Sequence, residues 1–228
     1  MRLAIDTSTA KAVLALDTEG GIIERVFEPL ATQRVIFAEL ANLLDPETLP
    51  LLEGIVIGLG PGSFTGLKIG VIAAKTLAWS REIPIVGVSS MDAVAAGTDA
   101  PSNPDSQLVV VFPSTRGEAY TRTYHYENQR WLPAGDITDA SLRTDAISKY
   151  LPDGPFIISG EGADKLADVL PDGTKFTLAD EGARCPRAQG IFSLAERRFE
   201  LEETDDPLRL VPMYIRPSQP ERLEKEGS

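Results

Sequence analysis

The residues whose types and spacing could do chemistry lie between Gly58 and Gly70. Pro61-Gly62 is typical of a tight turn, and Ser63 stands where the N-cap of a helix belongs. The N–H groups of the three residues after Ser63 would then form an anion site. Four glycines before Leu67 indicate that a ligand or another stretch of backbone lies very close to this corner.

The spacing of this corner fits neither common nucleotide-binding motif. A P-loop requires Lys directly after its last glycine, and here Leu67 follows Gly66. A dinucleotide fingerprint requires a third glycine where this chain has Ser63 or Thr65. Two interpretations stay open, an anion site and a tight turn that packs a helix onto a sheet.

The elements around the corner predict a mixed α/β fold. Three short apolar runs between Leu3 and Phe27 predict an antiparallel meander, and Thr32–Leu44 has the spacing of a helix. A β-branched run before the corner predicts a buried strand, and Phe64–Ser80 predicts a helix that is apolar nearly all round. Such a helix must be covered on more than one side, either by the Thr32–Leu44 helix or by a second protein.

The rest of the chain predicts a second, less regular lobe. Strands are expected at 83–88, 108–112, 119–126 and 156–159, and helices at 89–96, 143–150, 162–170 and 187–203. The Pro- and Ser-rich segment 97–106 predicts a lobe boundary, which gives an N-terminal lobe of residues 1–103, joined by the helix 187–203, and a smaller lobe of residues 106–182. The acid-rich end after Glu200 is expected to be a solvated terminus, disordered over 217–228.

Composition narrows the classes of protein. Hydrophobic residues make up 43% and charged residues 25% of the 228, as in ordinary globular proteins. The net charge of −12 argues against a stand-alone nucleic-acid binder, because phosphate neutralisation needs clustered Lys and Arg. No run reaches the roughly 20 apolar residues of a membrane helix. We therefore expect a cytoplasmic protein with no membrane contact.

The single histidine and single cysteine limit the chemistry further. His125 has no second histidine with which to share a metal, so no metal site is expected, and a Ser-His-Asp triad is disfavoured. Cys185 cannot form an intrachain disulfide, which fits a reducing compartment. It is either a small packed apolar residue, the interpretation we favour, or a nucleophile.

Several stretches resemble the TsaB family (YeaZ-type), a subunit of the bacterial machinery that makes threonylcarbamoyladenosine in tRNA. The corner matches the family's signature, which usually has Arg where this chain has Lys68. Ala4–Thr9 is similar to the family's first strand and turn, and Pro212–Arg216 to its C-terminal motif. The signature residues are Gly60, Pro61, Gly62, Ser63, Phe64, Thr65, Gly66 and Lys68.

The resemblance and the order of elements together imply a fold. Three antiparallel strands followed by alternating helices and strands are typical of a ribonuclease-H-like lobe, and two such lobes form the actin-like, Hsp70-ATPase-like (ASKHA) fold, here with a reduced second lobe. Enzymes of this superfamily hold a metal-bound nucleotide with an Asp after the first strand, followed by a glycine-containing loop. Asp6 is in place, but no glycine follows it. Asp6 and Thr7 are therefore interpreted as a vestigial nucleotide site, where Asp6 either caps the turn or binds metal.

The resemblance also implies a function without a cofactor of the chain's own. The chain would be a non-catalytic subunit that dimerises with the catalytic subunit TsaD, with the ATPase TsaE as third partner and tRNA bound only through the complex. Alone, it would form a homodimer through the same apolar surface. The predicted partner interface comprises Ile36, Leu40, Leu43, Leu67, Ile69, Ile72, Ala74, Lys75 and Ala78.

Three positions depart from the family pattern, and two other functions remain as rivals. Ala31, Pro113 and Thr115 stand where the family often has His, Asp and Arg, which weakens whatever that surface does in relatives. One rival is an actin-like ATPase or small-molecule kinase that uses Asp6 and the Gly60–Gly66 corner. The other is a peptidase, for which one His and one Cys leave few residues.

Overall fold

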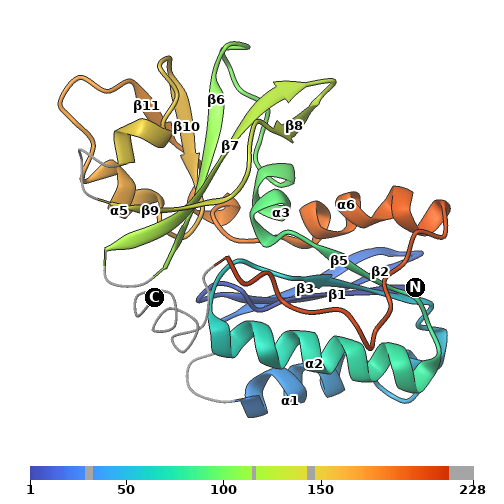
Figure 1. Ribbon diagram of the computed structural model, residues 1–228. Helices are drawn as coiled ribbons and strands as arrows, with labels where there is room; N and C mark the ends of the chain where they lie inside the picture. Colours follow the sequence, from blue (N-terminus) through green and yellow to red (C-terminus); the bar gives the residue numbers. More distant parts are fainter. Residues whose placement is uncertain (29–32, 115–116, 143–146, 216–228) are drawn as a thin grey trace.

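The computed structural model describes residues 1–28, 33–114, 117–142 and 147–215 of the chain. Two β-sheets lie one above the other, and α3 (Ser90–Ala96) lies between them (Figure 1). The lower sheet carries Asp6 and the start of the glycine-rich corner.

The first sheet contains β1 (Arg2–Asp6), β2 (Ala12–Thr18), β3 (Gly21–Phe27), β4 (Gly54–Gly58) and β5 (Ile85–Val88). Its strand order is β3-β2-β1-β4-β5. The first three strands pair antiparallel, as the meander predicted, and β4 and β5 continue the sheet in parallel. Because β1 and β4 are central and parallel, their carboxyl ends meet at one edge, where Asp6 and the glycine-rich corner lie.

Helices cover both faces of this sheet. α1 (Gln33–Leu43) and α2 (Phe64–Arg81) lie below it, and α6 (Ala188–Glu200) lies above it (Figure 1). The alternation of side chains along β1 serves both layers, since Leu3 packs on the α1–α2 side and Ala4 on the α6 side. A 3₁₀ turn, Leu49–Leu51, follows α1. Within the described ranges, no helix has the length and apolarity to cross a bilayer.

The second sheet repeats the topology of the first. Its strands are β6 (Gln107–Pro113), β7 (Glu118–Glu127), β8 (Arg130–Pro133), β10 (Phe156–Ser159) and β11 (Phe176–Leu178). The order β11-β10-β6-β7-β8 has the same three antiparallel strands and the same two parallel additions. A further strand, β9 (Thr138–Ser141), pairs with β7.

The helices of the second sheet are short. The only α-helix described between β10 and β11 is α5 (Ala163–Ala167), and the 3₁₀ turns Ser148–Tyr150 and Glu181–Ala183 complete the described part of this lobe. The predicted fold of two ribonuclease-H-like lobes, the second reduced, is confirmed. The predicted lobe boundaries stay predictions.

Some expected elements differ from those observed. β8, β9 and β11 have three or four residues each and were missed, because runs this short carry little periodicity. Of the helix expected over 143–150, residues 143–146 lie outside the described part, and the last three residues form a 3₁₀ turn. The predicted strand at 83–88 begins only at Ile85, after Pro84.

The solvated terminus predicted after Glu200 is wrong over residues 205–215. The segment Asp205–Tyr214, here called the strap, runs back across the first sheet and in front of α2 (Figure 1). The N–H of Asp205 donates to the carbonyl of Ile85, and the N–H of Met213 donates to that of Leu59, each at 2.8 Å. β5 is the edge strand of this sheet, and an edge strand offers unpaired backbone groups to which the start of the strap bonds. Residues 217–228 lie outside the described part.

Two ion-pair clusters join distant elements. Asp92 on α3 accepts from Arg122 at 2.8 Å and from the hydroxyl of Tyr124 at 2.7 Å, which ties the helix between the sheets to β7. Glu24 on β3 accepts from Arg187 and from the N–H of Ala188 at the start of α6. The second cluster caps α6 with a carboxylate and joins the end of the chain to the first sheet.

Candidate functional site

Asp6 is fully buried at the end of β1, and both of its carboxylate oxygens are bonded within the chain. Oδ1 accepts from the N–H of Ser8 at 2.8 Å and from its hydroxyl at 2.6 Å. Oδ2 accepts from the hydroxyl of Ser90 at 2.6 Å. The first two bonds are those of an Asx turn, so Asp6 caps the turn, one of the two roles that the sequence left open.

Burial controls the charge of Asp6. Removal from water raises the pKa of its carboxyl above the usual value of 3.8, against the opposing bonds from Ser8 and Ser90. The carboxylate is also closed in by backbone, because a Cβ added at Gly58 would overlap Oδ2. Asp6 thus points into packed protein, held by donors of its own chain.

The glycines of the corner are explained by the turn after β1. A Cβ at Gly62 would overlap the carbonyl oxygen of Ser8, and one at Gly66 would overlap that of Thr7. The N–H of Ser63 donates to the Ser8 carbonyl at 2.7 Å, and the Thr7 hydroxyl donates to the Gly66 carbonyl at 2.8 Å. The sequence allowed either a ligand or another stretch of backbone beside these glycines. In the structure, the backbone of Thr7 and Ser8 fills that space.

The N-terminus of α2 is capped as the sequence predicted. The hydroxyl of Ser63 accepts from the N–H of Gly66 at 3.2 Å. The ring of Phe64 lies 5.7 Å from that of Tyr214 on the strap, and the Lys68 ammonium lies 3.9 Å from the Phe64 centroid. The signature therefore places an exposed aromatic pair and a cation at the start of α2.

Most residues of the predicted partner interface are covered by this chain. Ile69 is half-buried, whereas Ile72 keeps 60% of its surface exposed. The sheet, α1 and the strap are thus the cover that α2 required, and they leave one stripe of it open. The side chains buried in the chain's own core are Ile36, Leu40, Leu43, Leu67, Ala74 and Ala78.

An apolar groove of about 440 Å³ lies between α1 and α2. Phe37 and Ile72 rim it, and both are exposed. Leu49, in the 3₁₀ turn that follows α1, also lines it. The α1–α2 groove is lined by Phe37, Leu40, Ala41, Leu44, Leu49, Ile72, Ala73, Thr76 and Leu77.

Lys75 lies on the side of α2 that faces the strap. Its Nζ donates to the carbonyl of Leu210 at 2.7 Å and to that of Leu208 at 3.4 Å. The ammonium therefore binds backbone of the strap, which explains a cation within so apolar a helix.

The residues of the peptidase hypothesis do not form a reactive group. His125 is exposed on β7, with its Nε2 3.5 Å from Glu127. Cys185 is buried, and burial raises the pKa of its thiol, which disfavours the nucleophilic thiolate. The described ranges contain no cluster of three side chains suited to a metal.

Of the three residues that depart from the family pattern, the structure describes one. Pro113 ends β6 and pairs with Ala119 across the sheet. Ala31 and Thr115 lie outside the described residues.

Sequence reasoning missed several residues of the site. Ser90 was assigned only to a helix start, and nothing in the sequence connects it to Asp6, 84 positions away. Phe37 and the exposed strap residues Leu208 and Val211 were also missed. A helical wheel of α1 would have found Phe37, whereas the strap residues carry no periodic signal.

Comparisons with known proteins agree with this geometry. The family model described as TsaD, tRNA N6-adenosine threonylcarbamoyltransferase, matches residues 47–185. The chain is 32% identical to the tRNA threonylcarbamoyladenosine biosynthesis protein TsaB of Bacillus subtilis (strain 168), over 96% of this chain and 95% of that protein. It is 28% identical to TsaB of Escherichia coli (strain K12), over 94% of each.

Solved structures support the fold. YeaZ from Pseudomonas aeruginosa superposes with a TM-score of 0.76 at 22% identity, over 94% of this chain and 99% of that one. A second structure, described as an uncharacterized protein with similarity to peptidase YeaZ from the same organism, has a TM-score of 0.74 at 23% identity, over the same shares. At these identities, the likeness concerns the fold.

Proposed function

Because this chain belongs to the TsaB family of tRNA threonylcarbamoyladenosine biosynthesis proteins, we propose that it serves as a non-catalytic subunit that binds a TsaD-family protein. In this proposal the chain transfers no group itself. It contributes a surface that holds the catalytic partner in its active conformation.

The closed environment of Asp6 is the observation that carries the non-catalytic role. An acid that holds a metal-bound nucleotide needs a free oxygen aimed at the ligand. Here, Ser8 and Ser90 donate to both oxygens, and Gly58 backs directly onto the carboxylate. The same reasoning applies to the corner, whose glycines accommodate Thr7 and Ser8 in place of phosphates.

The partner surface in this proposal is the α1–α2 groove with its exposed rim. Phe37, Ile72 and Trp79 are 49%, 60% and 65% exposed, which is unusual for side chains of this size on neighbouring helices. The proposal gives a TsaD-family partner a helix pair equivalent to α1 and α2. The match of residues 47–185 to the TsaD family model supports this for α2, which lies within the match, whereas α1 precedes it. Two such pairs can associate about an approximate two-fold axis, and the chain alone would form a homodimer in the same way.

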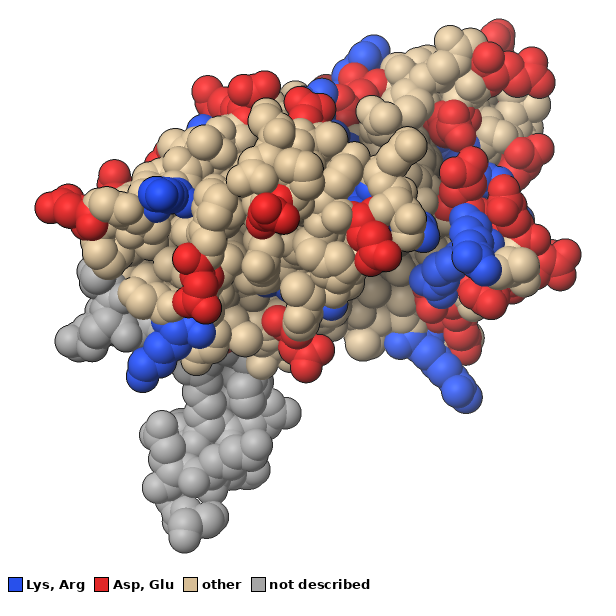
Figure 2. Space-filling model, turned by 90° about the horizontal axis from the view of Figure 1, so that it is seen from above, with Lys and Arg blue, Asp and Glu red and all other residues tan. Residues whose placement is uncertain are grey.

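Charge supports an indirect role toward tRNA. Figure 2 shows acidic side chains spread over the face that carries the second sheet and α6, with Lys and Arg scattered among them. With a net charge of −12, the chain repels phosphate, so the proposal leaves tRNA to the partner. The proposal also includes the ATPase TsaE as the third component of the assembly, and a cytoplasmic location for the chain.

Exposed residues provide the test. Substitution of Ala74 or Ala78 by Arg would disrupt the core, because both are buried, whereas Phe37→Asp and Ile72→Asp change only exposed surface. We expect each variant to lose co-purification with the TsaD-family protein of the same organism and to lower threonylcarbamoyl transfer to tRNA by the full assembly. Ile22→Asp, at an exposed position on β3, is the matched control.

Two results would contradict the proposal. One is wild-type binding and activity of both groove variants. The other is micromolar binding of ATP and Mg²⁺ by the isolated chain in calorimetry, accompanied by turnover at the rate of the full assembly, which would favour the kinase-like alternative.

A further inference from the structure

The side chain of Lys75 on α2 is hydrogen-bonded to the middle of the strap. Lys75 donates from Nζ to the carbonyls of Leu208 and Leu210, in the middle of the strap. At the start of the strap, the carboxylate of Asp205 accepts from the N–H of Gly87 at 2.7 Å. Near the end of the strap, the N–H of Met213 donates to the carbonyl of Leu59, directly after β4. The two ends are therefore fixed to the sheet, and the middle is held by the buried side chain of Leu210 and by the bonds from Lys75.

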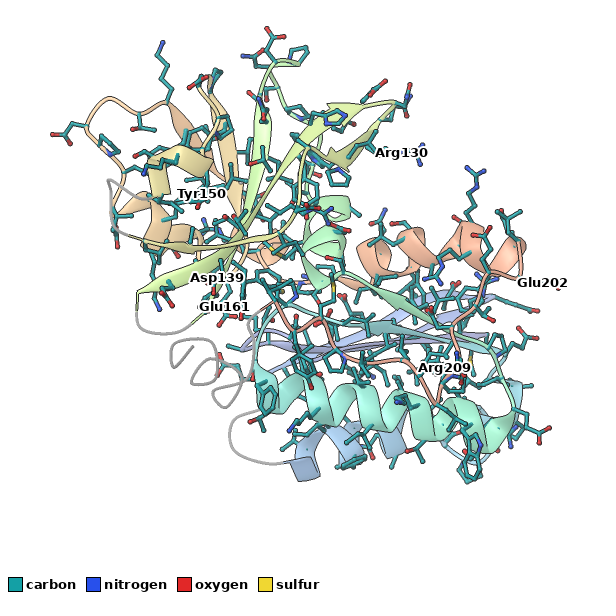
Figure 3. The ribbon with its side chains drawn as sticks, viewed as in Figure 1. Arg130, Asp139, Tyr150, Glu161, Glu202 and Arg209 are labelled. Atoms are coloured by element: carbon teal, nitrogen blue, oxygen red, sulfur yellow. The ribbon has the colours of Figure 1, made fainter. Side chains whose placement is uncertain are left out.

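The strap presents apolar side chains outward. Leu208 is 72% exposed and Val211 is 61% exposed, whereas Leu210 between them is buried in the core. Tyr214 stacks at a tilt on Phe64, which continues the apolar surface to the start of α2. Figure 3 shows Arg209, also on the strap, in front of α2.

The strap and α1 flank the same stripe of α2. Lys68, Ile72 and Trp79 are spaced by four and seven residues, so they lie along one line of the helix. Lys75, three residues after Ile72 and four before Trp79, lies on this line as well. The α1–α2 groove lies on one side of the line, and the strap, which Lys75 reaches, lies on the other. Half of the exposed large apolar side chains in the described ranges lie on these three elements: Phe37, Phe64, Ile72, Trp79, Leu208, Val211 and Tyr214.

We propose that the strap is a third element of the partner surface, in which Leu208 and Val211 contact the TsaD-family partner and Lys75 is a positioning residue that acts through the strap. This inference rests on the function proposed above. A stable interface buries roughly 800 Å² on each side. The strap adds exposed apolar side chains to those that the groove and its rim offer. A partner helix pair laid along the open stripe of α2 covers both borders of that stripe, and the strap is one of them.

The test measures affinity for the purified TsaD-family partner of the same organism, with the full-length chain. We expect Leu208→Asp and Val211→Asp each to weaken binding, raising the dissociation constant about tenfold or more. Leu201→Asp, at a 53% exposed leucine at the end of α6 on the opposite face of the sheet, is the matched control and is expected to bind as wild type. Thermal unfolding verifies that all three variants fold.

The positioning role of Lys75 is tested by a second measurement besides affinity, the hydrogen exchange of the strap. Lys75→Met keeps most of the stem and removes the ammonium, so we expect faster amide hydrogen exchange at Leu210 and Met213, unchanged exchange in β1 and β4, and weaker partner binding. Lys75→Arg retains donors for the two carbonyls and is expected to restore both properties. Faster strap exchange with wild-type affinity would overturn the positioning role.

The outcomes separate this inference from the proposed function. If the strap variants bind as wild type while Ile72→Asp loses binding, the strap inference is overturned and the proposed function stands. If Phe37→Asp and Ile72→Asp also bind as wild type, both are overturned. If the strap variants abolish self-association of the chain but leave partner affinity unchanged, a second copy is the occupant, and the inference is again overturned.

Discussion

The hydroxyl of Ser90 bridges the carboxylate of Asp6 and the backbone of the glycine-rich corner. It donates to Oδ2 of Asp6 at 2.6 Å and accepts from the N–H of Gly60 at 3.0 Å. The N–H of Ser90 in turn donates to the Gly60 carbonyl at 2.9 Å. One buried serine thus joins the carboxyl ends of β1, β4 and β5.

Ser90→Ala is expected to destabilise the protein by about 3 kcal/mol, because a buried carboxylate and a buried N–H each lose a partner. Urea denaturation measures the effect. The control is Ser89→Ala, which removes only the N-cap bond to Asp92 and is expected to cost about 1 kcal/mol. Equal losses in the two variants would contradict the bridging role.

Asp6→Asn is expected to gain stability relative to wild type as the pH rises. Since burial raises the pKa of Asp6 in the folded protein, the folded state binds more protons than the unfolded state from about pH 3.8 up to that raised pKa. Ionisation therefore costs wild-type stability across this window, and the asparagine variant has no such cost. Chemical denaturation from pH 4 to 8 measures the difference, and a difference independent of pH would show that Asp6 titrates as in the unfolded chain.

Glu24→Gln is expected to show the opposite dependence on pH. Burial alone would raise the pKa of Glu24, but bonds from Arg187 and from the N–H of Ala188 together hold it below its usual 4.5. This stabilisation is fully present above pH 4.5 and is lost as the pH falls through the lowered pKa. We expect a loss of about 1–2 kcal/mol at pH 7, measured by denaturation, which shrinks toward pH 3. A loss that stays constant would exclude the charge as its cause.

Gly66→Ala is expected to destabilise the protein by about 1–3 kcal/mol, although alanine is the better helix former. The added Cβ would overlap the carbonyl of Thr7, which is backbone and cannot move aside cheaply. Gly20→Ala, where the nearest atom is a side-chain oxygen at 3.7 Å, is the control. Thermal unfolding compares the two, and a stabilised Gly66→Ala would show that the corner has room to spare.

The sequence predicted the elements of the first sheet well, because their signals are local. Ser63 as N-cap, the turn at Pro61-Gly62 and the apolar pattern of α2 all act within a few residues. The glycine density correctly predicted a close approach, but only the structure identified the Thr7 and Ser8 carbonyls as the neighbours. Apolar spacing could not distinguish Ala74, which is buried, from Ile72, which is exposed, because both fit a helix covered on several sides.

The features that were missed depend on contacts between residues far apart in the chain. Ser90 reaches Asp6 across 84 positions, and Lys75 reaches the carbonyl of Leu210 across 135. A pattern within a window of 10 to 20 residues contains no information about such pairs. The strap is the clearest example, since the acid-rich composition of the whole segment after Glu200 favoured solvent, whereas backbone bonds to Ile85 and Leu59 hold the strap on the first sheet.

The way in which α6 and the strap complete the first sheet has a consequence during translation. Residues 1–96 leave the ribosome early, yet the upper face of their sheet gains its cover only when 188–200 emerge, and the edge of β5 is paired only after Asp205. The intervening residues of the second sheet leave the exit tunnel before that cover exists. Nascent chains therefore expose Ala4, Val56 and Val86 to solvent for most of their synthesis, and this is the interval in which chaperones protect such surfaces.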